Sequence, residues 1–190
     1  MEKSKKMWIV IILIGIVSVT SLTIALASGS QQLDITNNAQ VDPRTFGVEF
    51  SNLSSATITA NAEVIVAPSL SSSLISGLKV RLPEIGSKIS YTFNVTNTGD
   101  YDAEIDTLNL STPNCSGTGA SKLTDEGLVC ENLIFTLTYT TGGTTVATDD
   151  ELDSGETKNM TLTIGYSGAT MPSDIVEIED LNISISYVQK

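Results

Sequence analysis

The sequence contains no histidine. Histidine is the commonest general base near neutral pH and the commonest zinc ligand, so its absence removes the usual catalytic triads and most zinc sites. No serine, threonine or cysteine stands in a recognisable nucleophile motif, and the separation of carboxylates in space does not follow from the sequence. We therefore expect no enzymatic activity and no cofactor.

Basic residues are also scarce. The 10 lysines and arginines are outnumbered by 22 acidic residues, which gives a formal net charge of −12 at pH 7. A surface of this sign repels the phosphates of nucleic acids and the headgroups of anionic lipids. The composition therefore excludes nucleic acid as a partner and predicts a highly soluble exposed surface.

The longest uncharged run lies at the N-terminus. Lys3, Lys5 and Lys6 precede residues 7–27, which carry no charge, and Ala25-Leu-Ala27 has the small-x-small form of a cleavage site. This pattern predicts an apolar signal helix over residues 1–27, with the rest of the protein extracellular or at the cell surface. We expect cleavage after Ala27. The alternative is retention as an anchor, in which residues 7–27 contact the membrane, because the run is long enough to span a bilayer.

The sequence has two cysteines, Cys115 and Cys130. In a cytosolic protein they would be free thiols, whereas an exported chain passes through an oxidising compartment. We therefore predict a disulfide between them, which would close a polar, glycine-bearing loop over residues 111–131.

Alternation of apolar and polar residues recurs along the chain, most cleanly at Ile89, Tyr91, Phe93 and Val95. A period of two is typical of a strand with one buried face. The segments with this pattern cover residues 45–51, 56–66, 78–82, 89–95, 103–110, 133–139, 160–166 and 181–187. Turn residues separate them, and we expect no helix after the signal. The pattern predicts an all-β fold, an antiparallel β-sandwich of jelly-roll or immunoglobulin-like type, over residues 43–190.

Three local features refine this expectation. The apolar phase slips between Ile105 and Leu108, which predicts a β-bulge near Asp106. Residues 141–143 carry a hairpin signal, with residues 144–147 as the short partner. Residues 82–86, Leu-Pro-Glu-Ile-Gly, lie far from the C-terminus and are interpreted as a turn rather than a sorting signal.

Acidic residues gather in residues 149–156. Asp149, Asp150 and Asp153 are candidate calcium ligands, but Leu152 and Thr161 fall at positions where an EF-hand loop requires oxygen-rich ligands. We expect a solvated acidic loop, with weak calcium binding as the alternative. Six sequons make glycosylation a further expectation, at Asn52, Asn94, Asn109, Asn114, Asn159 and Asn182.

Several of these features together resemble the TasA/camelysin family of exported surface and biofilm-fibre proteins. They are the signal, Phe46-Gly-Val-Glu-Phe50, the turn at residues 82–86, and Ile89-x-Tyr-x-Phe-x-Val-x-Asn-x-Gly99 followed by Ala103 and Ile105. The plan is also similar to archaeal thread and bundling-pilus subunits. The usual Pro-Gly-Asp turn is replaced here by Pro83-Glu-Ile-Gly86, and the cysteine loop is not general in the family. Zinc protease chemistry credited to camelysins is not carried over, because histidine is absent.

The resemblance implies filaments assembled by donor-strand exchange, in which a segment freed by signal cleavage adds a strand to the next subunit. Residues 28–42 form an extended segment between the signal and the sandwich. Within it, Leu33 and Ile35 are the candidate anchors of the donor strand. The resemblance therefore implies a structural protein of a matrix or filament, with self-association as its main interaction.

Two other functions remain open. A retained anchor would make the chain a membrane-tethered monomer that binds a glycan or a protein through its loops. A secreted protease is the less favoured alternative, because it would need metal-dependent chemistry for which no residue provides a motif.

Overall fold

The computed structural model describes residues 44–190. The predicted signal or anchor helix at residues 1–27, the segment 28–42 and the anchors Leu33 and Ile35 lie outside the described residues. No helix in the described part is both long and apolar enough to cross a bilayer.

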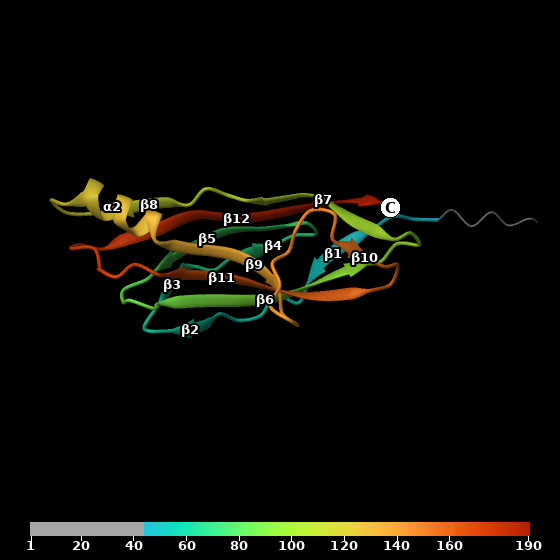
Figure 1. Ribbon diagram of the computed structural model, residues 1–190, viewed down its shortest axis with the longest axis horizontal. Helices are drawn as coiled ribbons and strands as arrows, with labels where there is room; N and C mark the ends of the chain where they lie inside the picture. The colour runs from blue at the N-terminus through green and yellow to red at the C-terminus, as the bar shows by residue number, and fades with distance from the viewer. Residues whose placement is uncertain (1–43) are drawn as a thin grey trace, which may run out of the picture. The chain divides into compact units, whose positions relative to one another are not determined.

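The strands form two antiparallel sheets, which we call sheet A and sheet B (Figure 1). Sheet A is five-stranded, in the order β1-β6-β11-β9, and β2 pairs with another part of β6. Its strands are β1 (Val48–Ser51), β2 (Thr57–Thr59), β6 (Lys88–Asn97), β9 (Leu133–Tyr139) and β11 (Thr157–Tyr166).

Sheet B is seven-stranded, in the order β10-β7-β12-β5-β3, with β4 paired to β5 and β8 paired to β12. The long strand β12 lies at its centre. The strands are β3 (Glu63–Val66), β4 (Ser69–Leu70), β5 (Leu74–Arg81), β7 (Ala103–Leu110), β8 (Asn114–Gly117), β10 (Glu151–Leu152) and β12 (Val176–Gln189).

Both sheets contribute their inner faces to one hydrophobic core. In β6 the buried and less buried residues alternate, as the sequence pattern predicts, and the ring of Phe93 lies 5.2 Å from that of Phe50. On the sheet B side Ile178, Ile183 and Ile185 of β12 are fully buried. The prediction of an all-β antiparallel sandwich is therefore confirmed at the level of its architecture.

The turn after β6 holds the start of the described chain. Asn97 is fully buried, and its amide donates to the carbonyls of Tyr101 and Leu152 at 2.8 and 3.0 Å. Thr45 and Asp100 exchange backbone and side-chain hydrogen bonds, including Asp100 N–H to the Thr45 carbonyl at 2.8 Å. A side chain at Gly99 would come within 2.8 Å of the Gly47 nitrogen, so only glycine lets the two backbones approach this closely.

The three local predictions agree with the structure. The register between β7 and β12 shifts between Ser186 and Tyr187, which pair with Thr107 and Ile105 and leave Asp106 as the extra residue. Thr138 and Thr145 bridge across the predicted hairpin. In the turn at residues 82–86, Gly86 has φ of 82°, and Ser87 N–H donates to the Glu84 carbonyl at 3.0 Å.

The prediction that no helix follows the signal is wrong, because α2 (Lys122–Glu131) lies in the cysteine loop. This helix has no side-chain N-cap and buries only Asp125 and Val129, so its sequence lacks the apolar stripe that signals a helix. Tertiary contacts hold it instead. The predicted disulfide between Cys115 and Cys130 is confirmed and ties α2 to β8, with a Cα–Cα distance of 6.0 Å.

Candidate functional site

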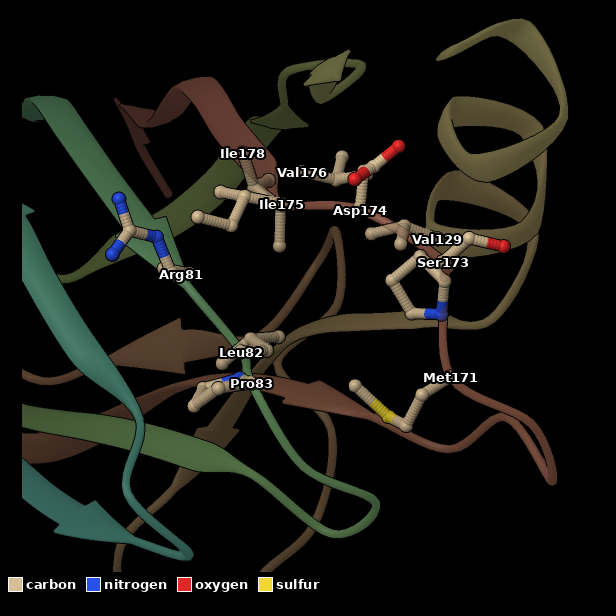
Figure 2. A pocket seen from close by; sticks show the side chains of 11 residues that line it. Arg81, Leu82, Pro83, Val129, Met171, Ser173, Asp174, Ile175, Val176 and Ile178 are labelled. Carbon is tan, nitrogen blue, oxygen red and sulfur yellow. The ribbon is translucent and has the colours of Figure 1, made fainter. Parts of the chain in front are cut away.

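One end of the described unit carries α2 and an apolar cavity of about 300 Å³ (Figure 2). We call this end the α2 pole. The cavity lies between the end of β5, the start of β12 and the helix. Most of its lining is aliphatic, and the lining residues are Arg81, Leu82, Pro83, Val129, Met171, Pro172, Ser173, Asp174, Ile175, Val176 and Ile178.

Local sequence explains why the cavity forms here. Pro83 cannot continue the hydrogen-bond ladder, and β5 ends at Arg81. The loop before β12 carries Pro172 and remains irregular, so no strand closes this end of the sandwich. Ile175 is left 52% exposed although its side chain is fully apolar. The cavity therefore presents apolar surface that no residue of 44–190 covers.

Arg81 is the cationic residue of the lining. Its Nη1 lies 2.9 Å from Glu63 Oε2 and its Nη2 lies 3.2 Å from Glu177 Oε1. Its Nε is buried and has no hydrogen-bond acceptor among residues 44–190. Figure 2 shows Arg81 and Asp174 on opposite sides of the cavity. The apolar lining of the cavity would suit a ligand with an apolar body.

The helical wall of the cavity is fixed by hydrogen bonds from a buried acid. Asp125 is 2% exposed and accepts the backbone N–H groups of Ser173 at 3.0 Å and Asp174 at 3.1 Å. Glu126 accepts the N–H of Gly117 at 2.8 Å, which joins α2 to β8. The wall is therefore held by three charge-assisted hydrogen bonds and the disulfide rather than by a large apolar interface.

The second feature near the α2 pole is a free strand edge on β9. This strand pairs with β11 along one side, and on its other side the hairpin covers only its end, through Tyr139 N–H to Thr144 and Val146 N–H to Leu137. Residues 133–136 have no strand partner on that side within the described unit. Leu133 and Phe135 face the core but remain half-buried. An unpaired edge beside half-covered apolar side chains is a site at which another strand can add.

The described chain begins at the other end of the unit. Thr45 is bonded to Asp100 in the turn after β6, whereas Leu82 and Pro83 of the cavity lie near the start of β6. The ten residues of β6 run between these two ends, a length of about 30 Å. Figure 1 shows α2 at one end and β10 towards the other. The described chain therefore begins at the end of the unit away from the cavity.

The candidate calcium ligands do not form a cluster. Asp150 Oδ2 accepts the Tyr139 hydroxyl at 2.9 Å and the Ala147 N–H at 2.8 Å, while the Asp153 N–H donates to Glu156. Within residues 44–190, no three His, Cys, Asp or Glu side chains are placed to hold a metal ion. Burial of Tyr139 raises the pKa of its phenol well above the usual range, and the hydrogen bond to Asp150 raises it further.

The sequon asparagines lie in different environments. Asn94 and Asn159 are cross-strand partners on the outer face of sheet A. The side chain of Asn182 is already engaged, because Oδ1 accepts the Gly77 N–H at 3.0 Å and Nδ2 donates to the Asp180 carbonyl at 3.0 Å. The exposed members of the set are Asn52, Asn109, Asn114 and Asn159.

No local sequence pattern predicts the cavity. Its residues come from three segments that are separated from one another by more than 40 positions, and Arg81 has no motif around it. A second hollow, of about 330 Å³, is polar and includes Tyr139, Lys158 and Asn159.

Comparisons with family models, with curated proteins and with solved structures found no match.

Proposed function

We propose that this protein is a structural subunit of an extracellular or cell-surface filament, in which residues 31–37 of one copy add as a strand to the free edge of β9 in the next copy. The observation that carries the proposal is the unpaired edge at residues 133–136. It lies towards the α2 pole, whereas the described chain begins at the other end of the unit.

The chemistry of both partners fits strand addition. Gln31–Asn37 alternates polar and apolar residues, with Leu33 and Ile35 two positions apart on one face. Added beside β9, these two side chains would cover the half-buried Leu133 and Phe135. Backbone hydrogen bonds supply the pairing, and the alternate apolar side chains set the register.

The placement of donor and acceptor decides the form of the assembly. A contact between different surfaces of two copies is heterologous, and it extends into an open filament when its rotation does not close a ring. With the donor leaving at one end and the acceptor lying near the other, each added copy offers a new free edge. The export signal and the resemblance to the TasA/camelysin family point to the same assembly.

The first experiment tests the donor strand in the exported chain beginning at Ser28. We expect Leu33→Asp with Ile35→Asp to abolish fibres seen by electron microscopy, because two buried carboxylates oppose strand addition. The matched control, Gln32→Asp with Thr36→Asp, adds the same charge on the other face of the segment and should leave fibres intact. Fibres that persist in the Leu33/Ile35 variant would refute the donor role.

The acceptor is tested with a synthetic peptide of residues 28–42. Added to the exported chain, it should occupy free β9 edges and shorten the fibres in proportion to its concentration. The same peptide carrying Leu33→Asp and Ile35→Asp should have no effect. Fibre lengths that do not change with either peptide would contradict strand addition as the mechanism of assembly.

A second function is favoured by the cavity at the α2 pole. We propose, as the alternative, a membrane-tethered monomer whose cavity binds an apolar group of a glycan or protein ligand. Mass spectrometry of the exported protein distinguishes the two functions. A mature N-terminus at Ser28 frees the donor segment, whereas a chain that still contains residues 7–27 favours the tethered monomer.

A further inference from the structure

Beyond Lys88, the first residue of β6, the outer face of sheet A is free of charge over three neighbouring strands. Its outward side chains alternate with more deeply buried residues, and all except the exposed Ile134 of β9 carry a hydroxyl or an amide. We call this surface the hydroxyl face. Its residues are Ser90, Thr92, Asn94 and Thr96 of β6, Thr157, Asn159, Thr161 and Thr163 of β11, and Thr136 and Thr138 of β9.

The residues of the hydroxyl face form cross-strand rows. Thr92 pairs with Thr161, which in turn pairs with Thr138, and Asn94 pairs with Asn159. Hydroxyls bond across the strands at 2.9 Å between Thr96 and Thr157, and neighbouring Thr140 bonds to Thr161 at 2.8 Å. The side chains of this face are uncharged, so withdrawing them from water costs less than withdrawing charged groups.

Opposite charges mark the two ends of this face. Lys88 lies at the start of β6, one alternate position before Ser90. Glu49 of β1 pairs with Thr96 at the other end. Both side chains are exposed, and within residues 44–190 neither one forms an ion pair. The face therefore has a positive end and a negative end separated by uncharged rows.

This charge distribution favours a second copy of the chain as the partner. A chain with a net charge of −12 repels its own copies wherever acidic groups meet. Two copies approach without that repulsion across the hydroxyl face. If they lie antiparallel, the Lys88 end of one copy meets the Glu49 end of the other, and this happens twice by symmetry. In a parallel arrangement, like charges would meet.

We propose that two copies of the chain without sugars on Asn94 and Asn159 pair through their hydroxyl faces in an antiparallel, two-fold arrangement, with Lys88 of each opposite Glu49 of the other. The two-fold axis crosses the middle row, so Thr92 of one copy faces Thr92 of its partner. The contact is isologous and closes on itself, unlike the strand addition proposed above. The dimer does not depend on strand addition.

The size of the face sets the strength of the contact. Four alternate positions on β6 and β11 and two on β9 cover at most about 25 Å by about 15 Å, so the contact buries no more than roughly 800 Å² in total. This is below the area of about 1,200 Å² or more that stable interfaces bury, so we expect a weak dimer. Repetition of the contact along two filaments would multiply its effect, because each further contact forms at high effective concentration.

The test uses charge reversal in the exported chain beginning at Ser28, with Leu33→Asp and Ile35→Asp present so that strand addition does not interfere. Sedimentation equilibrium at low ionic strength measures the dimer. Glu49→Lys alone and Lys88→Glu alone should each weaken dimerisation about tenfold or more, because each sets like charges together twice. The double reversal, Glu49→Lys with Lys88→Glu, should restore the wild-type association.

A second variant tests the symmetry axis. Thr92→Asp places two carboxylates against each other across the axis and should also abolish the dimer, whereas Thr107→Asp adds the same charge on exposed β7 and should not. A chain that stays monomeric at millimolar concentration would overturn the proposal. So would single reversals that dimerise like the wild type, or a double reversal that remains as weak as the singles. Fibres that persist in the Leu33/Ile35 variant would refute strand addition alone and leave the dimer proposal standing.

Discussion

The outer faces of the two sheets use different side chains to link neighbouring strands. On sheet B, Lys79 Nζ lies 2.5 Å from Glu177 and 2.7 Å from Glu179 across β5 and β12, and Arg81 joins Glu177 to Glu63. On sheet A the corresponding cross-strand positions carry threonine, serine and asparagine. Both faces join neighbouring strands through side chains, one by ion pairs and the other by hydroxyls.

The difference shows how an acidic chain places its few cations. A hydrogen bond from Lys79 lowers the pKa of Glu177 most, and a hydrogen bond from Arg81 adds to this effect. In turn, hydrogen bonds to Glu177 and Glu179 raise the pKa of Lys79. Sheet B thereby combines several carboxylates on one surface without leaving them unpaired. The outer face of sheet A has almost no acidic side chains, so it does not need basic side chains to pair with them. It is therefore the surface where another acidic molecule meets least repulsion.

The largest expected effect tests whether the two sheets also differ in how much their buried faces stabilise the fold. Phe93→Ala in sheet A should destabilise the fold by about 3–5 kcal/mol, and Ile183→Ala in sheet B by about 2–5 kcal/mol, because both side chains are buried in one core. Urea unfolding followed by circular dichroism measures both. Comparable losses would show that the sheets differ on their outer faces alone. A loss below about 1 kcal/mol for either variant would mean that its sheet contributes little to the core.

The next effect concerns α2 and β8, which are attached to sheet B and have no counterpart on sheet A. Cys115→Ala with Cys130→Ala should cost about 3 kcal/mol, because the disulfide closes a loop with a separation of 15 residues. Reduction of the wild type should give the same urea midpoint as the double variant. An unchanged midpoint would show that Asp125 and Glu126 hold the helix without the covalent link.

The smallest expected effect is the pH dependence of stability, which should differ between the ion pairs of sheet B and the hydroxyl contacts of sheet A. The folded pKa of Glu177 is below its ordinary value of 4.5, so its contribution to stability is present above that pH and is lost as the pH falls through the folded pKa. The Tm difference between the wild type and Glu177→Gln should therefore disappear under acid conditions. Thr157→Val on sheet A should cost about 0.5 kcal/mol at every pH, because neither partner titrates. Equal pH dependence in both variants would contradict the comparison.

Strand periodicity allowed most of the sheets to be predicted. Clean alternation at residues 89–95 and 133–139 locates β6 and β9, since each strand has one buried and one solvated face. The slip of phase after Ile105 was sufficient to place the bulge at Asp106. In β12 the predicted segment begins at residue 181, whereas the strand begins at Val176, because the irregularity at Asp180, with φ of 59°, shifts the apolar phase between Ile178 and Leu181.

The helix and the cavity could not be predicted for a different reason. The residues of α2 are polar and glycine-bearing, and the contacts that hold them come from Ser173, Asp174 and Gly117, distant in sequence or in another element. The cavity depends on the same long-range contacts. Local patterns report only which face of an element is buried, so features built by tertiary hydrogen bonds leave no periodic signal.

The close approach of Gly99 to the start of the described chain has a mechanical consequence. β1 runs inward from the turn where Thr45 and Gly47 are bonded, and it lies antiparallel to β6. A pull on the chain ahead of Thr45, resisted at the α2 pole, acts along the length of β1. Its hydrogen bonds to β6 lie across that direction, so they are sheared together instead of opening one after another. The fold is therefore stiffest along the axis on which a tether or a neighbouring subunit would pull.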